Sequence, residues 1–326
     1  MINALLNNFL TQKINPDPDI LTQASESQAR LREILANKLE EDDTLPSLLE
    51  AEDFLYGSAI RGTQPAPFDD IDLMLVLDGS TLVAKEAGQD MGPAYGSGKS
   101  QNPLTLPKYL DENGYISSQK ILNSIRDAVN EAYPRSEIRK DGQAINLWMD
   151  SYGFGIDVVP AFKINHVRSG VHYFIPAGTN SHMWQSTNPW SDIQAFKVED
   201  TRLGGLLSST SRIIRKWNEV SNAKRLSGFH IDALVYCSLY NKNILTIEDA
   251  VRACFDSFDP LLANTCPQFS GFAPHIDHKL KDEHRMQSRL NVQTAKNSLS
   301  TARLDAFTPA DKILSIWDKV FCEKLI

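Results

Sequence analysis

Basic residues are scarce in this chain of 326 residues. Its 33 Lys and Arg residues are outnumbered by 41 Asp and Glu residues, which gives a formal net charge of −8 at pH 7. A protein that coats nucleic acid along its backbone needs a clustered basic footprint. The composition therefore argues against that class of protein and against a nucleic-acid activator, although a local basic groove remains compatible with it.

Cysteine motifs, long apolar runs and a leader sequence are also lacking. The four cysteines are scattered without a C-x-x-C pair, which indicates neither a zinc ribbon nor a disulfide framework. No apolar run approaches membrane-spanning length, and the N-terminus lacks the basic region and cleavage site of a signal peptide. We therefore expect a cytoplasmic protein without a membrane partner.

The chain is long enough for two lobes, each with its own core. The expected elements are helices over 20–41, 118–133 and 203–222, strands over 54–56, 70–77, 144–149 and 154–159, and a helix starting at Thr308-Pro309. Residues 78–117, rich in Gly, Pro and Ser, are interpreted as a surface excursion. We predict an α/β protein with an N-terminal helix and a mixed αβ catalytic lobe over 1–187, followed by a helical lobe over 188–326.

The most informative segment is a strand–turn–strand stretch in the first quarter. Residues 54–56 run into Gly57-Ser58, and the chain returns as an apolar strand that begins with Asp70-Ile71-Asp72. Because successive side chains of a strand point to opposite faces, Asp70 and Asp72 project together. Buried charges must be paired or bound to metal, and Gly57 and Ser58 can approach a phosphate closely. This stretch predicts metal-assisted nucleotidyl transfer.

A third acidic residue, Asp157, lies on another apolar strand. Carboxylates from neighbouring strands could hold two divalent ions, which clamp the attacking and leaving oxygens of a phosphoryl transfer. Mg²⁺, or Mn²⁺ in its place, fits carboxylates combined with substrate phosphates. In this scheme Asp70 and Asp72 bridge the ions, while Asp157 completes the second ion's shell and helps a sugar hydroxyl to lose its proton.

Each of these features also has a purely structural interpretation. A Gly-Ser pair is a turn in most proteins, an Asp-x-Asp strand start is often a solvated edge, and Asp157 alone could be a surface residue. Asp69 has the wrong parity for the cluster and is interpreted as a turn residue. Lys216 shares a helix face with Arg212, and on local grounds it is a solvated lysine. The order of the motifs favours the functional interpretation.

Three segments in this order resemble the polymerase-β-type nucleotidyltransferase superfamily. They are Gly57-Ser58-Ala59-Ile60-Arg61-Gly62-Thr63, Asp70-Ile71-Asp72-Leu73 and Gly155-Ile156-Asp157-Val158-Val159-Pro160-Ala161-Phe162. They are most similar to the oligoadenylate synthase and cyclic GMP–AMP synthase branch and its bacterial relatives, the CD-NTases of anti-phage defence. The resemblance spans roughly residues 50–240. It implies a bilobal α/β fold with a mixed β-sheet N-lobe, a helical C-lobe and an active site in the cleft.

The resemblance also indicates nucleotide-binding residues in the second half of the chain. Residues 213–218 resemble a helix that bears a triphosphate-contacting lysine, here Lys216. Where the family carries a serine and a base-stacking tyrosine, this chain has Gly228 and Phe229, which preserves stacking but not the hydroxyl contact. Asn188 lies in a stretch that resembles a loop near the acceptor pocket, although Asn-Pro is equally a plain helix start.

The activity implied by the resemblance is a Mg²⁺-dependent synthesis of a cyclic di- or trinucleotide from nucleoside triphosphates, ATP among them, with release of pyrophosphate. A regulatory protein partner remains open. The alternatives are a linear oligoadenylate synthase, transfer of a nucleotide to a protein or small molecule, and an inactive relative that only binds a nucleotide. The presence of all three Asp residues counts against the inactive relative. Direct DNA sensing is not expected, because the zinc-ligand cluster of the animal synthase is absent.

Two further motifs are set aside. Residues 96–100 suggest a P-loop, but Pro93 stands where its first glycine belongs and Pro103 interrupts the helix that should follow. Histidines and an aspartate at 275–284 could bind a metal. Without cysteines at ligand spacing, solvated loop residues are the simpler interpretation.

Overall fold

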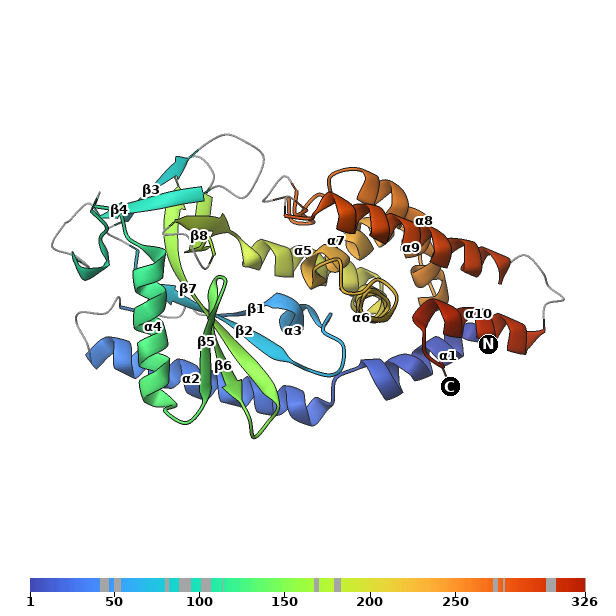
Figure 1. The fold of residues 1–326 in the computed structure, drawn as a ribbon, viewed down its shortest axis with the longest axis horizontal. Coiled ribbons are helices and arrows are strands. Elements are labelled where there is room, and N and C mark those ends of the chain that lie inside the picture. The colour runs from blue at the N-terminus through green and yellow to red at the C-terminus, as the bar shows by residue number, and fades with distance from the viewer. Residues whose placement is uncertain are drawn as a thin grey trace. The chain divides into compact units, whose positions relative to one another are not determined.

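The structure is a computed structural model that describes residues 1–41, 47–49, 54–79, 82–87, 95–100, 107–112, 114–166, 170–178, 183–271, 275–277, 279–302 and 309–325. The chain divides into two compact units, and Figure 1 labels their helices and strands where there is room. The sheet unit consists of Pro18–Ala59 and Phe68–Trp190, and the helical unit of Met1–Asp17, Ile60–Pro67 and Ser191–Ile326. No helix in the described ranges is long and apolar enough to cross a membrane.

The sheet unit is built on one mixed β-sheet, as the sequence predicts. Over the described residues the strand order is β1-β2-β7-β8-β9-β4-β3, with β6 added beside β7 and β5 beside β6. The strands are β1 (Phe54–Tyr56), β2 (Asp70–Leu77), β3 (Leu82–Ala87), β4 (Tyr95–Ser100), β5 (Glu137–Asp141), β6 (Ala144–Met149), β7 (Phe154–His166), β8 (Gly170–Pro176) and β9 (Trp184–Thr187). β2 and β7 run parallel, and the other paired strands run antiparallel.

The two faces of β2 have different surroundings because its side chains alternate. One face packs into a large apolar core through Ile71, Leu73, Leu75 and Leu77. The helices α2 (Pro18–Glu41) and α4 (Ser118–Ala132) contribute their apolar stripes to the same core and so cover this face (Figure 1). The opposite face carries Asp70 and Asp72 and then Met74, which belongs to a smaller apolar cluster. This second face therefore presents the acidic residues away from the main core.

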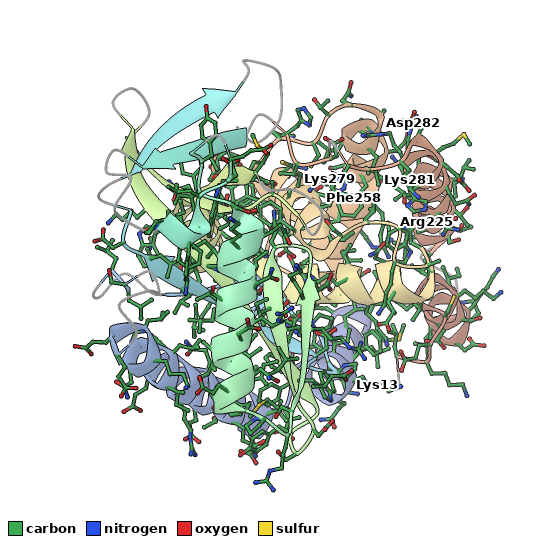
Figure 2. The ribbon with its side chains drawn as sticks, turned by 60° about the vertical axis from the view of Figure 1, so that its left-hand side comes forward. Lys13, Arg225, Phe258, Lys279, Lys281 and Asp282 are labelled. Atoms are coloured by element: carbon green, nitrogen blue, oxygen red, sulfur yellow. The ribbon has the colours of Figure 1, made fainter. Side chains whose placement is uncertain are left out.

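The helical unit has a single large apolar core. Its elements are α1 (Ile2–Phe9), a π-helical turn η1 (Leu10–Ile14), α5 (Pro189–Arg202), α6 (Leu206–Val220), α7 (Gly228–Leu239), α8 (Ile247–Ala263), α9 (Asp282–Thr301) and α10 (Ala310–Phe321). Trp217 and Phe255 meet edge to face in this core with ring centroids 5.2 Å apart, and Phe258 is fully buried among the helices (Figure 2). The Ser227 hydroxyl caps α7 by accepting a hydrogen bond from the backbone N–H of His230 at 3.2 Å.

The predicted lobe boundary needs a correction at the N-terminus. The change of unit at Trp190 and Ser191 lies close to the predicted division after residue 187, but residues 1–17 and 60–67 belong to the helical unit. The physical reason is apolar packing, because Ile2, Leu6 and Phe9 are buried in the helical core. The first helix is therefore part of the helical unit rather than of the sheet unit.

The expected surface excursion over 78–117 is only partly right. β3 and β4 lie within it as an antiparallel pair, and β4 continues the sheet by pairing with β9. Small residues lower strand propensity, but hydrogen bonding along a sheet edge can outweigh that preference. Residues 96–100 lie within β4 rather than between a strand and a helix, so they do not form a P-loop.

The other predicted elements differ from the structure mainly at their ends. α2, α4, β1, β2 and β6 are confirmed within two residues, whereas β7 runs on to His166. The helix expected over 203–222 begins at Leu206, because Gly204 and Gly205 adopt left-handed φ angles of +62° and +85°. Thr308 lies outside the described residues, and α10 follows Pro309.

Candidate active site

Four polar side chains form one row across the strands of the sheet unit. In the strand register Asn146 on β6 is opposite Asp157 on β7, Asp157 is opposite Asp72 on β2, and Asp72 is opposite Tyr56 on β1. Side chains that are directly paired in a sheet project from the same face. The row therefore carries two acidic residues flanked by an amide on one side and a phenol on the other.

Asp70 adds a third carboxylate to this face. It lies two residues before Asp72 on β2 and is paired with Gly155 on β7. The predicted geometry is thus found: Asp70 and Asp72 project together, and Asp157 stands beside Asp72 on the neighbouring strand. The roles assigned to the three residues stay predictions. Asp69, of opposite parity, is exposed.

The position of the Asp157 side chain is set by Asn146. The Asn146 Nδ2 donates a hydrogen bond of 2.7 Å to Asp157 Oδ1. An added Cβ at Gly155 would lie 2.6 Å from that nitrogen, so glycine leaves the space that the amide occupies. Burial raises the pKa of Asp157 from its usual value, and the hydrogen bond from Asn146 acts in the opposite direction. The amide therefore favours the charged form of a half-buried carboxylate.

Tyr56 lies at the other end of the row, and the pKa of its phenol is affected by all three carboxylates. Burial, with the negative charges of Asp72, Asp157 and Asp70 as the next causes in that order, raises the pKa of the Tyr56 phenol well above its usual range. Three carboxylates close enough to disfavour a phenolate create a strongly negative environment. Such an environment attracts cations.

Gly57 and Ser58 follow Tyr56 directly and begin a short helix, α3 (Gly57–Arg61), rather than the simple turn expected. Gly57 has φ +76°, and an added Cβ would lie 2.6 Å from the Cγ of Asp72. Glycine is therefore required for two reasons: its backbone conformation and the close approach of the acidic side chain. This contact places the Gly-Ser pair beside the carboxylates.

The acidic face fits a divalent cation by its chemistry. Within the described ranges, no three His, Cys, Asp or Glu residues already converge as a metal site. Mg²⁺ does not require such a cage, since it keeps several waters and binds through one or two carboxylates plus substrate phosphates. Paired carboxylates at adjacent register positions, one of them packed against Gly57, match that donor set.

Lys216, Phe229 and Asn188 occupy different elements. Lys216 lies on α6 with its side chain 20% exposed, and its Nζ is 3.4 Å from Glu219 Oε2. Phe229 lies in the first turn of α7 in the helical unit. Asn188 belongs to the sheet unit and directly precedes α5, which is also the position of a plain helix start. The nucleotide-binding roles of these residues stay predictions.

The residues near 275–284 do not match the expectation of a solvated loop at Asp277. Asp277 is buried, its carboxylate pairs with Arg285 Nη2 at 2.8 Å, and His275 Nδ1 lies 3.3 Å from it. Hydrogen bonding, chiefly from Arg285, outweighs the effect of burial and lowers the pKa of Asp277 from its usual value. The group is an internal ion-pair cluster that connects this segment to α9.

Sequence reasoning missed Tyr56 and Asn146. Both are single polar residues in short strands whose pairing partners could not be identified from spacing alone. A signal was present for Asn146, because only residues 150–153 separate the strands expected over 144–149 and 154–159, which is the length of a turn between neighbouring strands. Counting residues outward from that turn would have placed Asn146 opposite Asp157.

Comparisons with known proteins agree with the family resemblance that the sequence motifs indicate. The model of the Second Messenger Oligonucleotide or Dinucleotide Synthetase domain (SMODS) matches residues 103–199, which include Asn146 and Asp157. A probable cyclic nucleotide synthase of Bacillus cereus (strain VD146) is 25% identical over 251 residues, which are 74% of this chain and 72% of that protein.

Two solved structures of CdnC from E. coli MS115-1 share the fold. The structure described as CdnC with ATP has a TM-score of 0.71 at 14% identity and covers 99% of this chain and 98% of that chain. The complex of CdnC with HORMA-deltaN has a TM-score of 0.68 at 14% identity and covers 98% and 96%. The domain match, the curated relative and the fold all agree with the resemblance to the bacterial CD-NTases that the sequence motifs indicate.

Proposed function

We propose that this chain condenses nucleoside triphosphates into a cyclic di- or trinucleotide and releases pyrophosphate. The domain match and the curated relative, a probable cyclic nucleotide synthase, support nucleotidyl transfer and cyclic oligonucleotide synthesis. The observation that carries the proposal is the row Asn146–Asp157–Asp72–Tyr56, with Asp70 on the same sheet face. A strand pair that places carboxylates side by side is suited to binding the cations that accompany a triphosphate.

Asp70, Asp72 and Asp157 would hold Mg²⁺ at this face, with two ions as the expected number. When bound, Mg²⁺ stabilises the charge that develops on the phosphate oxygens during transfer. The protein's own contribution is positional. The hydrogen bond from Asn146 orients Asp157, which we assign to the reacting sugar hydroxyl, and the close contact of Gly57 with Asp72 keeps the Gly-Ser pair beside the acids.

The remaining contacts to the nucleotide follow from the family resemblance. We assign Gly57 and Ser58 to the β- and γ-phosphates and Lys216 to the triphosphate. Phe229 supplies a ring on which a base stacks, and Asn188 lies near the acceptor nucleotide. ATP is expected among the substrates, since one similar structure is described with ATP.

The direct test is incubation of the purified chain with mixed nucleoside triphosphates and Mg²⁺. Mass spectrometry after phosphatase treatment separates cyclic from linear products, because a cyclic product has no terminal phosphate to lose. A resistant cyclic product is the expected result. Linear products would favour an oligoadenylate synthase, and complete recovery of the triphosphates under every metal condition would favour an inactive nucleotide-binding relative.

A matched pair of variants tests whether the activity depends on the carboxylates of the acidic face. Asp72→Ala removes a carboxylate from the row, so product formation should fall by at least about a thousandfold while the protein remains folded. Asp69→Ala removes an exposed carboxylate three positions away on the opposite parity and should leave product formation within about threefold. Equal losses in the two variants would contradict the assignment.

A regulatory protein partner and a role in anti-phage defence complete the proposal. The E. coli protein of similar fold is described in complex with HORMA-deltaN. By analogy, we propose that a protein partner controls this chain's activity. Product formation by the purified chain alone, compared with the chain in lysate of its own host, measures that control.

A further inference from the structure

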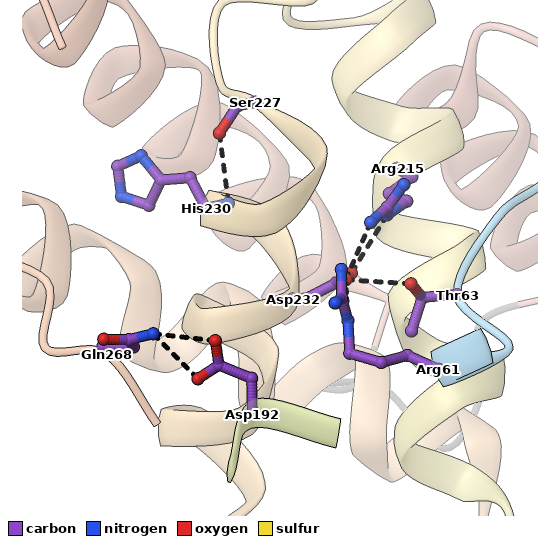
Figure 3. A network of polar contacts seen from close by, with 8 residues as sticks. All are labelled: Arg61, Thr63, Asp192, Arg215, Ser227, His230, Asp232 and Gln268. Carbon is purple, nitrogen blue, oxygen red and sulfur yellow. Dashed lines mark hydrogen bonds and ion pairs between the residues drawn. The ribbon is translucent and has the colours of Figure 1, made fainter. Parts of the chain in front are cut away.

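A fully buried carboxylate organises the polar interior of the helical unit. Asp232 on α7 has no exposed surface and accepts hydrogen bonds from three side chains (Figure 3). Arg61 approaches Asp232 Oδ2 through Nε at 3.1 Å and Nη2 at 3.0 Å, and the Thr63 hydroxyl donates to the same oxygen at 2.8 Å. Arg215 forms a two-point pair, from Nε to Oδ1 at 3.0 Å and from Nη2 to Oδ2 at 2.7 Å.

Burying these charged groups costs desolvation free energy, so the role of the cluster needs an explanation. Two guanidinium groups share one carboxylate away from water, with the side chains of Arg61 and Arg215 only 7% and 13% exposed. Replacing a buried ion pair by apolar residues is often neutral or stabilising, so such a pair is weak support for a role in stability alone. What it does provide is a fixed geometry for the segments that it joins.

Arg61 and Arg215 both reach the segment that holds Phe229. The guanidinium carbon of Arg61 lies 5.2 Å from the centroid of the Phe229 ring, and the Phe269 ring lies at the same distance on a tilted plane. Arg215 Nη1 lies 2.6 Å from the place where a Cβ on Gly228 would stand. The residue before Phe229 is therefore glycine because the guanidinium group occupies the side-chain space.

Arg61 also ends α3, the five-residue helix that Gly57 and Ser58 begin. Ser58 is three residues before Arg61 in this helix, and Arg61 itself belongs to the helical unit together with Asp232 and Phe229. Thr63 and Arg212 add to this, since the first bonds Asp232 and the second donates to the carbonyl oxygen of Gly62. The same cluster thus holds the segment that follows the Gly-Ser pair and the segment that presents Phe229.

We propose that Arg61, Arg215 and Asp232 are positioning residues for the nucleotide. Through Arg61 they fix the end of α3 and one face of the Phe229 ring, so that the ring assigned to base stacking is held in one orientation within the helical unit. This inference rests on the proposed function, which assigns nucleotide contacts to Ser58 and Phe229. The guanidinium group covers one face of the ring, so a base stacks on the remaining surface.

The test is Arg61→Lys, compared with Arg252→Lys as a matched control. Both arginines are 8% exposed, both form a two-point pair with a carboxylate, and both lie over an aromatic ring. Arg252 makes these contacts with Glu248 and Trp317, and neither residue is assigned to the nucleotide. Lysine keeps the charge but loses the planar fork, so both variants should lose thermal stability to a similar extent.

Only Arg61→Lys should change nucleotide binding. We expect the KM for ATP, and the Kd of a fluorescent ATP analogue with Mg²⁺, to rise about tenfold in Arg61→Lys and to remain within twofold in Arg252→Lys. If Arg61→Lys does not fold, Thr63→Val removes a single donor to Asp232 and should raise both constants about threefold. Unchanged constants in the folded Arg61 variant, or the same rise in both arginine variants, would overturn the inference.

The two proposals fail in different ways. If the wild-type protein binds the ATP analogue but forms no product, the proposed synthase activity fails, while the comparison of Kd values still decides the role of Arg61. If the wild type forms a cyclic product and Arg61→Lys keeps its KM, the positioning role fails alone. Absence of both binding and product in the wild type would overturn both.

Discussion

Asn146 offers the sharpest test of the acidic face. Replacing it with alanine removes the 2.7 Å hydrogen bond to Asp157 without altering any carboxylate. A hydrogen bond to a charged group contributes about 1.5–3 kcal/mol. If this bond holds Asp157 for the reaction, its free energy is lost from the stabilisation of the transition state. Because 1.36 kcal/mol corresponds to a tenfold change in rate, kcat/KM should fall by roughly ten- to 150-fold.

The assay is the steady-state rate of pyrophosphate release from ATP with Mg²⁺, accompanied by a thermal unfolding measurement. Gln143→Ala is the matched control, since Gln143 Nε2 also donates one part-buried side-chain hydrogen bond in the sheet unit, to Gln185 Oε1 at 3.2 Å. The control should lose a similar amount of stability and keep its kcat/KM within about threefold. A wild-type rate for Asn146→Ala, or an equal fall in both variants, would refute the reasoning.

Three further outcomes are expected. Gly155→Ala places a Cβ 2.6 Å from the Asn146 amide, so its pyrophosphate release should fall as in Asn146→Ala, and a wild-type rate would show that the amide moves without consequence. Gly57→Ala should abolish activity because the new Cβ overlaps Asp72. Gly153→Ala is its control, since Gly153 has a similar φ of +74° and nothing within 4 Å of an added Cβ; this variant should lose only about 1–2 kcal/mol of unfolding free energy in urea. Equal activity of the two variants would show that the overlap with Asp72 does not matter. Burial lowers the pKa of His230 from 6.5 to about 4, so the unfolded chain binds more protons between these values and stability is lost as the pH falls from 6.5 to 4. His230→Gln should remove up to about 3 kcal/mol of that loss. If urea unfolding shows that both proteins lose the same free energy of unfolding between pH 7 and pH 4.5, the assignment to His230 is wrong.

The part of the site that sequence predicts is the part fixed by local rules. Side-chain alternation places Asp70 and Asp72 on one face without knowledge of any partner strand. The pairing of Asp72 with Asp157 depended on recognising the order of the motifs, and the parallel register of β2 and β7 then placed them side by side. Alternation and motif order were therefore sufficient for the three carboxylates.

The contacts that sequence did not predict depend on distant packing. Asp232 lies in an apolar helical stretch, and nothing in its spacing connects it to Arg61, 171 residues earlier. The N-terminal helix has a stripe of apolar residues that would suit either unit, and its assignment is decided by which core has room for Ile2 and Phe9. Local pattern gives each segment a buried face but does not specify the surface against which that face packs.

The division of the chain into interleaved units affects how the protein is made. Residues 1–17 leave the ribosome well before their apolar partners, which belong to Ser191–Ile326, have been synthesised. Domains that are contiguous in sequence commonly fold from the N-terminus during synthesis. The helical unit cannot fold in this way, because its core is not complete until its last segment has been made. During most of translation Ile2, Leu6 and Phe9 lack the residues that bury them in the folded protein. A nascent chain halted near residue 190 would expose them as an apolar segment to which chaperones can bind.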